Sequence, residues 1–368
     1  MKGLYIHIPF CLKKCAYCDF NSAVAPDSKK EEYVNALICE MSEYKGAEFD
    51  TVYIGGGTPT ALETELLAKV IENIGVNFSV SPDAEFTVEM NPKTADFKKL
   101  DMMYKMGVNR LSIGVQSFCD DELCALGRIH NCKDAKDAIA LAREVGFENI
   151  SIDLMSAIPH QTMESFKETL DTAILQNPDH ISCYSLILEE ETPLFDSVNA
   201  GEITLCDEET EREMYEYAVE TLEKNGYMQY EISNFAKNGK VSRHNLKYWN
   251  LEEYIGLGLS AHSFAGGVRL ANTDDIAEYN RHNFRNGEKE VLTKKEMMSE
   301  FMFLGLRKTE GVSKSVFFEK FGRNIYDIFP KSLEKFLKTG FLIDENGKVR
   351  LSHSAVIVSN QIMCEFLL

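Results

Sequence analysis

Residues 4–18, LYIHIPFCLKKCAYC, decide how the rest of the sequence is interpreted. The first five residues form a short apolar run that predicts a buried strand. The loop directly after it carries Cys11, Cys15 and Cys18 in the spacing C-x3-C-x2-C. Three thiolates in one short loop can bind three corners of a cubane iron–sulfur cluster, which leaves the fourth iron without a protein ligand. An iron with an open position is a reaction site, as is a catalytic zinc with a vacant position.

Other uses of three clustered cysteines fit the spacing less well. A structural zinc site needs a second pair of ligands, and no CxxC or HxxxH pair lies nearby. Covalent attachment of a c-type haem needs a histidine directly after CxxC, but Asp19 follows Cys18. The remaining alternative is that the three cysteines are unrelated buried side chains. The other seven cysteines show no ligand spacing, and we expect them to be small buried hydrophobic residues.

Short β-rich runs alternate with amphipathic helical patterns through the first two thirds of the chain. The predicted strands are residues 4–8, 51–54, 85–90, 110–115, 150–155 and 181–186, and the predicted helices are 30–45, 63–74, 94–106, 132–145, 163–176 and 208–225. Six strands that are each followed by a helix predict a parallel sheet with right-handed crossovers. The predicted fold class is therefore α/β, with a partial (β/α)6 barrel.

Several predicted strands end in glycine or polar residues. These are Gly55, Gly56 and Gly57 after the second strand, Glu89 in the third, Gln116 after the fourth and Asp153 in the fifth. The carboxyl ends of the strands form the active face of a β/α barrel. We therefore expect these residues to lie at one site.

The alternation weakens after residue 226, and we predict three regions. They are a barrel over 1–226, an aromatic- and glycine-rich connecting region over 227–290, and a small C-terminal domain over 291–368. Helical patterns at 293–307, 313–321 and 331–338 and a hairpin at 341–351, with Gly347 at its turn, indicate a helical domain with a two-stranded wing. The charge of the chain favours a structural role for this wing over nucleic-acid binding.

Composition narrows the class of protein. The chain has 368 residues, and 39 basic against 58 acidic residues give a net charge of −19. So acidic a surface repels phosphate backbones and anionic lipid head groups, which argues against nucleic-acid binding. No apolar run is long enough for a transmembrane helix, and the N-terminus does not resemble a secretory signal. Ten cysteines in such a chain predict a reducing, cytoplasmic location.

The cysteine motif beside a β/α repeat resembles the radical S-adenosylmethionine (SAM) superfamily. Residues 5–11, YIHIPFC, and 55–60, GGGTPT, narrow the resemblance to the branch that contains oxygen-independent coproporphyrinogen III oxidase. The resemblance implies a [4Fe-4S] cluster held by the three cysteines and SAM bound at the open iron. In that superfamily one electron from the cluster cleaves SAM to methionine and a 5′-deoxyadenosyl radical, so the cofactors carry the chemistry.

The resemblance also implies which residues surround SAM. The backbone of residues 55–58 can approach the methionyl amino group closely because the glycines have no Cβ. Glu89 resembles the family's ribose-binding carboxylate, although it could be an ordinary solvated acid. Other residues match further positions of the cofactor pocket or flank the cluster loop: Tyr5, Tyr17, Gly55, Gly56, Gly57, Thr58, Gln116, Arg128 and Asp153. A surface salt bridge is the alternative for Arg128, and generic aromatic packing is the alternative for the two tyrosines.

Two departures from the oxidases favour their HemW-type relatives, which bind haem and pass it to respiratory haem proteins. The oxidases carry a fourth cysteine where this sequence has Phe20, and they have a substantial segment ahead of the position of Tyr5. Residues 244–249, HNLKYW, match the H-N-x-x-Y-W stretch of the HemW group. His244 is thus a candidate axial haem ligand, with Tyr248 and Trp249 against the porphyrin. Alternatively, His244 fixes a loop while the two aromatics fill a domain junction.

The predicted function is a haem chaperone that carries a [4Fe-4S] cluster and SAM. Its predicted partners are haem and haem-accepting respiratory proteins, with peripheral membrane association through a protein partner because the charge gives no anchoring. The alternatives are a coproporphyrinogen III oxidase, another radical SAM enzyme, and a binding protein with a vestigial metal site. Productive SAM cleavage stays open, since haem insertion needs no radical.

Overall fold

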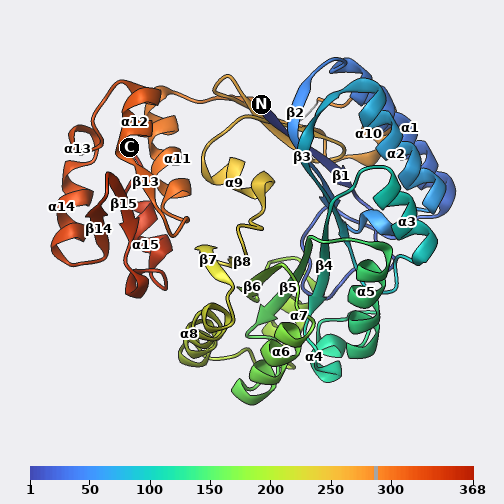
Figure 1. Cartoon of the computed structure of the whole chain (residues 1–368), viewed down its shortest axis with the longest axis horizontal. Coiled ribbons are helices and arrows are strands. Elements are labelled where there is room, and N and C mark those ends of the chain that lie inside the picture. The colour runs from blue at the N-terminus through green and yellow to red at the C-terminus, as the bar shows by residue number, and fades with distance from the viewer. Residues whose placement is uncertain (286–288) are drawn as a thin grey trace.

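The computed structural model describes residues 1–285 and 289–368. Within these residues twelve strands form one sheet, in the order β12-β11-β10-β9-β1-β2-β3-β4-β5-β6-β8-β7. Its six central strands are parallel and follow one another along the chain (Figure 1). They are β1 (Lys2–Ile8), β2 (Glu48–Gly56), β3 (Ser79–Met90), β4 (Arg110–Gln116), β5 (Ile150–Ser156) and β6 (His180–Ser185). All six predicted strands are therefore present.

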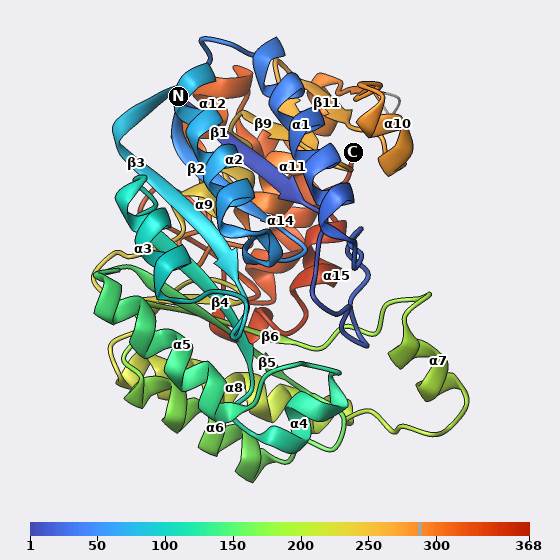
Figure 2. The same cartoon turned by 90° about the vertical axis from the view of Figure 1, so that its right-hand side faces the viewer.

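Helices cover the outer, convex face of these strands (Figures 1 and 2). They are α1 (Asp27–Glu43), α2 (Thr64–Asn77), α3 (Phe97–Lys105), α4 (Asp120–Ala125), α5 (Cys132–Val145), α6 (Met163–Leu175) and α8 (Glu208–Lys224), with a 3-10 turn at Pro59–Ala61. Helix α7 (Pro193–Asn199) instead projects away from the sheet on the segment after β6 (Figure 2). Local sequence fixes where some of them begin. Asn131 and Thr162 each form a capping box at the start of α5 and α6, which satisfies amide groups that have no partner inside the helix.

The sheet is curved but not closed. Its sixth parallel strand, β6, pairs with the antiparallel strand β8, and β1 pairs on its other side with β9. The result is the predicted partial barrel, with one main hydrophobic core that includes Leu4, Ile54, Val88 and Ile113. In contrast to this core, the inner face of the partial barrel is lined mainly by polar side chains.

Residues 227–285 contribute more regular structure than the sequence indicates. They contain β7 (Met228–Glu231), β8 (Asn234–Ala236), β9 (Tyr254–Leu257), β10 (His262–Ala265), β11 (Val268–Ala271), α9 (Arg243–Trp249) and α10 (Ile276–Asn280), and β12 follows at Lys289–Val291. All of these strands join the sheet of the barrel. They are only three or four residues long, too short for a clear alternation of apolar and polar residues.

The C-terminal part has its own hydrophobic cluster, which includes Met302, Phe317, Leu333 and Phe366. Its elements are α11 (Lys294–Gly305), β13 (Val312–Ser313), α12 (Lys314–Phe321), α13 (Ile325–Ile328), α14 (Pro330–Lys338), β14 (Leu342–Glu345), β15 (Lys348–Leu351), a 3-10 turn at His353–Ala355 and α15 (Ser359–Cys364). The predicted wing is the β14–β15 hairpin, in which Asn346 and Gly347 both have positive φ, as a tight hairpin turn requires. The region boundaries at 226 and 290 stay predictions.

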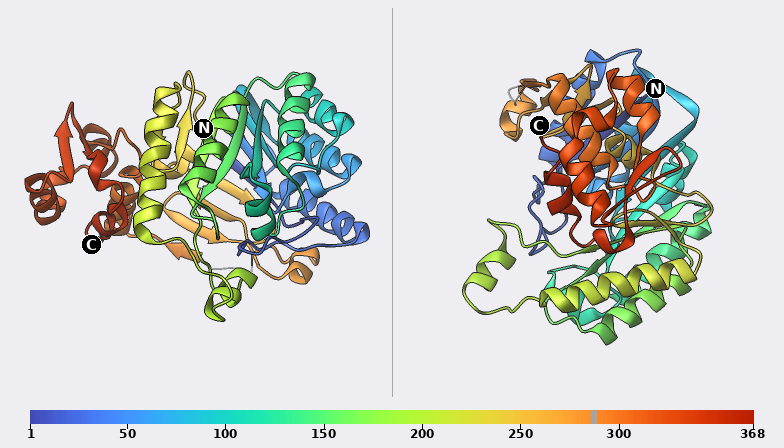
Figure 3. Two further views of the ribbon diagram at one scale, coloured as in Figure 1. Left: turned by 90° about the horizontal axis from the view of Figure 1, so that it is seen from below. Right: turned by 90° about the vertical axis from the view of Figure 1, so that its left-hand side faces the viewer.

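The C-terminal elements stand to one side of the sheet (Figure 3). Helix α9 lies between the two parts in Figure 1 and contacts both β2 and α11. The HNLKYW segment therefore lies at a junction. Among the described residues, no helix combines the length and the apolar character that crossing a membrane requires.

The expectation that seven cysteines are buried is wrong for most of them. Cys183 is buried, and burial raises its pKa to about 12. The others are exposed or half-buried: Cys39, Cys119, Cys124, Cys132, Cys206 and Cys364. Several of these lie on helices at the surface, where one small hydrophobic side chain is tolerated.

Candidate functional site

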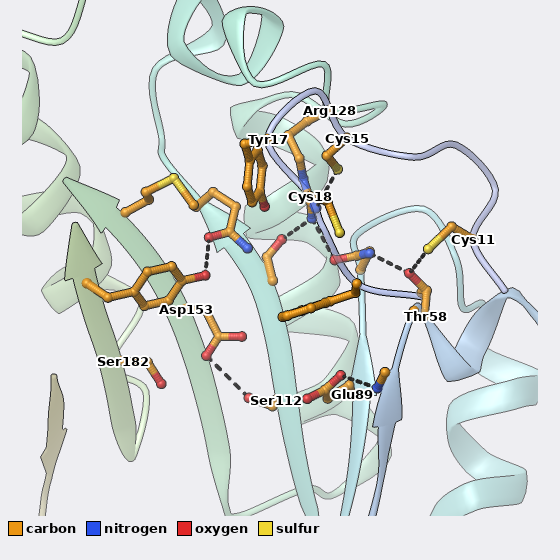
Figure 4. A pocket seen from close by; sticks show the side chains of 18 of the residues that line it. Cys11, Cys15, Tyr17, Cys18, Thr58, Glu89, Ser112, Arg128, Asp153 and Ser182 are labelled. Carbon is orange, nitrogen blue, oxygen red and sulfur yellow. Dashed lines mark hydrogen bonds between the residues drawn. The ribbon is translucent and has the colours of Figure 1, made fainter. Parts of the chain in front are cut away.

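A cavity of about 450 Å³ opens at the carboxyl ends of the parallel strands and extends inward between them (Figure 4). Most of the predicted site residues line it: Cys11, Cys15, Tyr17, Cys18, Gly56, Gly57, Thr58, Glu89, Gln116, Arg128 and Asp153. The volume lies within the range of small-molecule sites, about 300–1,000 Å³. Of the residues at predicted strand ends, all but Gly55 therefore lie around one cavity.

The cysteine loop is tied to its surroundings by backbone hydrogen bonds. The Cys11 amide donates to the carbonyl of Ala23 at 3.1 Å, and the Ala16 amide donates to the carbonyl of Leu126 at 3.0 Å. The amide of Leu194 donates to the carbonyl of Ala16 at 2.9 Å. These bonds hold both ends of the loop, so the three thiols face the cavity from a constrained backbone.

A chain of polar contacts links Cys15 to Cys11 (Figure 4). The Arg128 guanidinium donates to Cys15 Sγ at 3.3 Å and to Asn91 Oδ1 at 2.6 Å. The amide of Asn91 then donates to Thr58 Oγ1 at 2.7 Å, and this hydroxyl lies 3.6 Å from Cys11 Sγ. Arg128 therefore makes no surface salt bridge within the described chain. Its contacts position it beside the cysteine loop.

The glycine run permits a close approach that no other residue allows. A Cβ on Gly57 would lie 2.7 Å from the carbonyl oxygen of Phe10 and 3.1 Å from Cys11 Sγ. A Cβ on Gly56, whose φ is 109°, would lie 2.6 Å from the ring of His7. A Cβ on Gly55 would lie 2.9 Å from the Glu89 carboxyl. Side chains at these positions would collide with His7, Phe10 or Glu89, so the glycines let this turn pack closely against its neighbours.

Two carboxyl groups face the middle of the cavity. Glu89 accepts a hydrogen bond from Tyr53 at 2.7 Å and one from the Gly56 amide at 3.2 Å. Burial, together with the nearby Asp153, raises the pKa of Glu89 to about 7. Asp153 accepts from the Ser112 hydroxyl at 3.3 Å, and burial raises its pKa as well. Both carboxyls can therefore accept hydroxyl groups of a ligand.

Gln116 ends β4 in an unusual conformation. Its φ is 70°, which is uncommon for a residue other than glycine. Its side chain is buried and accepts a hydrogen bond from Tyr184 at 3.0 Å. The left-handed backbone turns the end of the strand, so the amide faces the cavity.

Other predicted site residues lie outside the cavity lining. The Tyr5 hydroxyl is 3.1 Å from Nδ1 of His7, and Gly55 lies behind Glu89. Of the HNLKYW segment, Asn245 lines the cavity, whereas His244, Tyr248 and Trp249 do not. The segment therefore borders the inner end of the cavity through its asparagine.

His244 is held inside the fold. It is 1% exposed and stacks on Tyr53 with 5.2 Å between ring centroids. Its Nδ1 is 2.9 Å from Thr51 Oγ1, and its Nε2 is 2.8 Å from the Tyr248 hydroxyl. Burial lowers the pKa of His244 to about 3, so the ring is neutral. Both nitrogens are engaged, and an axial-ligand role, which stays a prediction, requires these hydrogen bonds to break.

Trp249 makes a cation–π contact with Arg307. The guanidinium of Arg307 is 4.5 Å from the centre of its ring, and the indole nitrogen has no hydrogen-bond partner among the described residues. Arg307 comes from the segment after α11. This contact matches the domain-junction alternative for the aromatic pair.

Several residues that line the cavity are not among those that the sequence predicts. They are inward-facing positions of β4 and β6, together with Asn91 and two later asparagines: Asn91, Arg110, Ser112, His180, Ser182, Tyr184, Asn234 and Asn245. The period of two along Arg110, Ser112, Gly114 and Gln116 was available in the sequence. Only the assembled barrel shows that this face is enclosed.

The donor set fits a cluster better than a single ion. Among the described residues, no group of three or more His, Cys, Asp or Glu side chains converges as the ligands of one metal ion do. In a cubane cluster each thiolate binds a different iron, so the three sulfurs stand apart. Three thiols on one loop that all line the same cavity fit this larger group.

Comparison with known proteins agrees with this fold. The radical SAM superfamily profile matches residues 5–173, and the HemN C-terminal domain profile matches residues 292–358. The chain is 42% identical to the haem chaperone HemW of Bacillus subtilis, covering 100% of this chain and 99% of that one. It is 34% identical to the haem chaperone HemW of Lactococcus lactis, covering 99% and 97%.

A solved structure has the same fold. The coproporphyrinogen III oxidase HemN of Escherichia coli superposes with a TM-score of 0.87, covering 99% of this chain and 89% of that one, at 23% identity. The similarity extends through the C-terminal part as well as the barrel.

Proposed function

Because the chain belongs to the HemW family of radical SAM proteins, we propose that it is a haem chaperone, which binds haem and passes it to a haem-accepting respiratory protein. The observation that carries this proposal is 42% identity to a haem chaperone over the whole length of both chains. Phe20, where the oxidases carry their fourth cysteine, supports it. This side chain is 60% exposed at the mouth of the cavity.

The family also implies a [4Fe-4S] cluster and SAM. Cys11, Cys15 and Cys18 would hold the cluster, and when bound it supplies one electron to the sulfonium group of SAM. Arg128 donates to Cys15 Sγ at 3.3 Å and so places a positive charge beside the cluster position. Gly56 and Gly57 line the cavity, so backbone carbonyls of this run could accept hydrogen bonds from the amino group of SAM.

The two buried carboxyls suit the ribose. Glu89 already accepts from Tyr53 and Gly56 and has remaining lone pairs for a pair of hydroxyl groups. Asp153 and Gln116 face the same space from β5 and β4. These residues would bind and orient a nucleoside on the inner face of the sheet.

Haem would bind next to the HNLKYW segment, between the barrel and the C-terminal part. In the structure His244 has no free ring nitrogen, so haem binding through it requires Tyr248 and Thr51 to release the ring. Transfer to a respiratory acceptor is part of the same proposal. With a net charge of −19 the chain would meet a membrane only through that protein partner.

Haem titration of the anaerobically reconstituted protein tests the proposal. We expect a saturable change in the haem absorption band at one haem per chain, and subsequent transfer to a haem-depleted b-type cytochrome. A parallel anaerobic assay with coproporphyrinogen III, reductant and SAM tests the oxidase alternative. Robust decarboxylation without haem binding would overturn the chaperone assignment.

A further inference from the structure

Arg110 is the first residue of β4 and lines the inner end of the cavity. It is 2% exposed and is one of the largest buried side chains among the described residues. Arginine is almost never fully buried unless it is paired. A charge in this position therefore needs an explanation.

Within the described chain, the Arg110 side chain has no hydrogen bond or ion pair. Its Nε is fully buried and without a partner. Leaving a buried charged donor unsatisfied is unfavourable, because the lost hydration is not replaced. Such a group persists when something outside the chain satisfies it.

The two carboxyls near Arg110 make their hydrogen bonds to other residues and none to Arg110. Glu89 accepts from Tyr53 and from a backbone amide, and Asp153 accepts from Ser112. They lie close enough for Arg110 to lower the pKa of each carboxyl, but neither forms an ion pair with it.

His180 is engaged in the same way. Its Nδ1 is 2.8 Å from Ser151 Oγ, and its Nε2 is 2.8 Å from the Tyr230 hydroxyl. Both ring nitrogens are therefore satisfied, and the guanidinium of Arg110 keeps its donors for the cavity.

We propose that Arg110 is the receptor for a carboxylate of the ligand that occupies the inner end of this cavity. A guanidinium matches a carboxylate with two parallel hydrogen bonds. Resting on the proposed function, this carboxylate is a haem propionate, because the HNLKYW segment borders the same end through Asn245. Arg110 would then orient the porphyrin rather than hold its iron.

The carboxylate of SAM is the other source of the same chemistry. Arg110 lies four residues before Gly114, whose carbonyl accepts from Arg128 beside Cys15. Four residues of strand span roughly 13 Å. A carboxylate at the cysteine loop is therefore too far from Arg110, which favours the propionate.

The experiment compares Arg110→Met, Arg110→Lys and wild type, all anaerobically reconstituted, by titration with four probes. They are haem, haem dimethyl ester, SAM and decarboxylated SAM. Arg143→Gln is the matched control, because Arg143 pairs with Asp179 at 2.6 Å outside the cavity. If Arg110→Met does not fold, Arg110→Lys alone decides, because it keeps the charge but loses the planar fork.

We expect Arg110→Met to weaken haem binding about tenfold or more, as loss of a charge-assisted hydrogen bond does. The dimethyl ester should bind wild type and variant equally, and SAM binding should not change. Arg110→Met could instead lose the wild-type preference for SAM over decarboxylated SAM and keep the preference for haem over its dimethyl ester. That result would identify SAM as the source of the carboxylate. Wild type that binds neither haem nor ester would refute the proposed function, and the SAM pair would still test Arg110. If Arg110→Met keeps the wild-type preference both for haem over its dimethyl ester and for SAM over decarboxylated SAM, the inference is overturned.

Discussion

The Nε2 atom of His244 lies 2.8 Å from the hydroxyl oxygen of Tyr248, one helical turn away in α9. With Thr51 on the other ring nitrogen, the histidine joins α9 to β2 of the barrel. The residue that the sequence marks as a haem ligand thus has a structural role in this conformation. The two roles can be separated experimentally.

We expect His244→Ala to lower the free energy of unfolding by about 3 kcal/mol, because a buried ring and two hydrogen bonds are lost. Tyr248→Phe, the matched variant, removes only one hydrogen bond and should lower it by about 1–2 kcal/mol. Urea unfolding measures both. Unchanged stability in His244→Ala together with lost haem binding would show that the ligand role dominates.

Glu89 makes the stability of the ligand-free protein depend on pH. Its pKa is raised to about 7 by burial, above its usual value in an unfolded chain. The folded state therefore binds a proton that the unfolded state has released, and stability falls as pH rises from about 4.5 to 7. At pH 8, Glu89→Gln should be more stable than wild type by about 2 kcal/mol.

Urea unfolding of both forms at pH 4.5 and pH 8 checks this sign. The difference between Glu89→Gln and wild type should shrink towards zero at the lower pH, where the folded state and about half of the unfolded chains hold the proton. A difference of the same size at both values would mean that the lost carboxylate, and not its ionisation, changes stability.

The sequence predicted the fold and most of the cavity because their signals are local. The spacing of Cys11, Cys15 and Cys18 lies within eight residues, and each barrel strand is long enough to show its apolar run. The sheet of a β/α barrel then brings strand ends together by topology. Glu89, Gln116 and Asp153 could thus be assigned to one site without knowing any contact.

The rest depends on partners that are distant in the chain. Strand β9 is four residues long and pairs with β1, about 250 residues earlier. Thr51 engages His244 from another element, and the missing partners of Arg110 become visible only when the barrel is assembled. No short pattern in the sequence carries this information.

Gly57→Ala should displace the cysteine loop. The added Cβ would lie 2.7 Å from a backbone oxygen, which cannot swing away as a flexible side chain can. We expect a loss of about 1–3 kcal/mol in stability and a marked fall in iron and sulfide bound per chain after reconstitution. Gly75→Ala in α2 is the control, because nothing lies within 4 Å of its added Cβ and alanine favours a helix. Equal cluster content in both variants would contradict the close packing of Gly57.

Cysteine-to-serine variants test whether the three loop thiols, and not the other cysteines, bind the cluster. Cys11→Ser, Cys15→Ser and Cys18→Ser should each lose most of the bound iron and sulfide, because a cubane held by three thiolates has no spare protein ligand. Cys124→Ser, at an exposed position of α4, should keep the wild-type content. Iron and sulfide analysis with the visible absorption spectrum measures both. Iron retained at the wild-type level by any loop variant, or zinc bound in place of iron and sulfide, would contradict the predicted cluster.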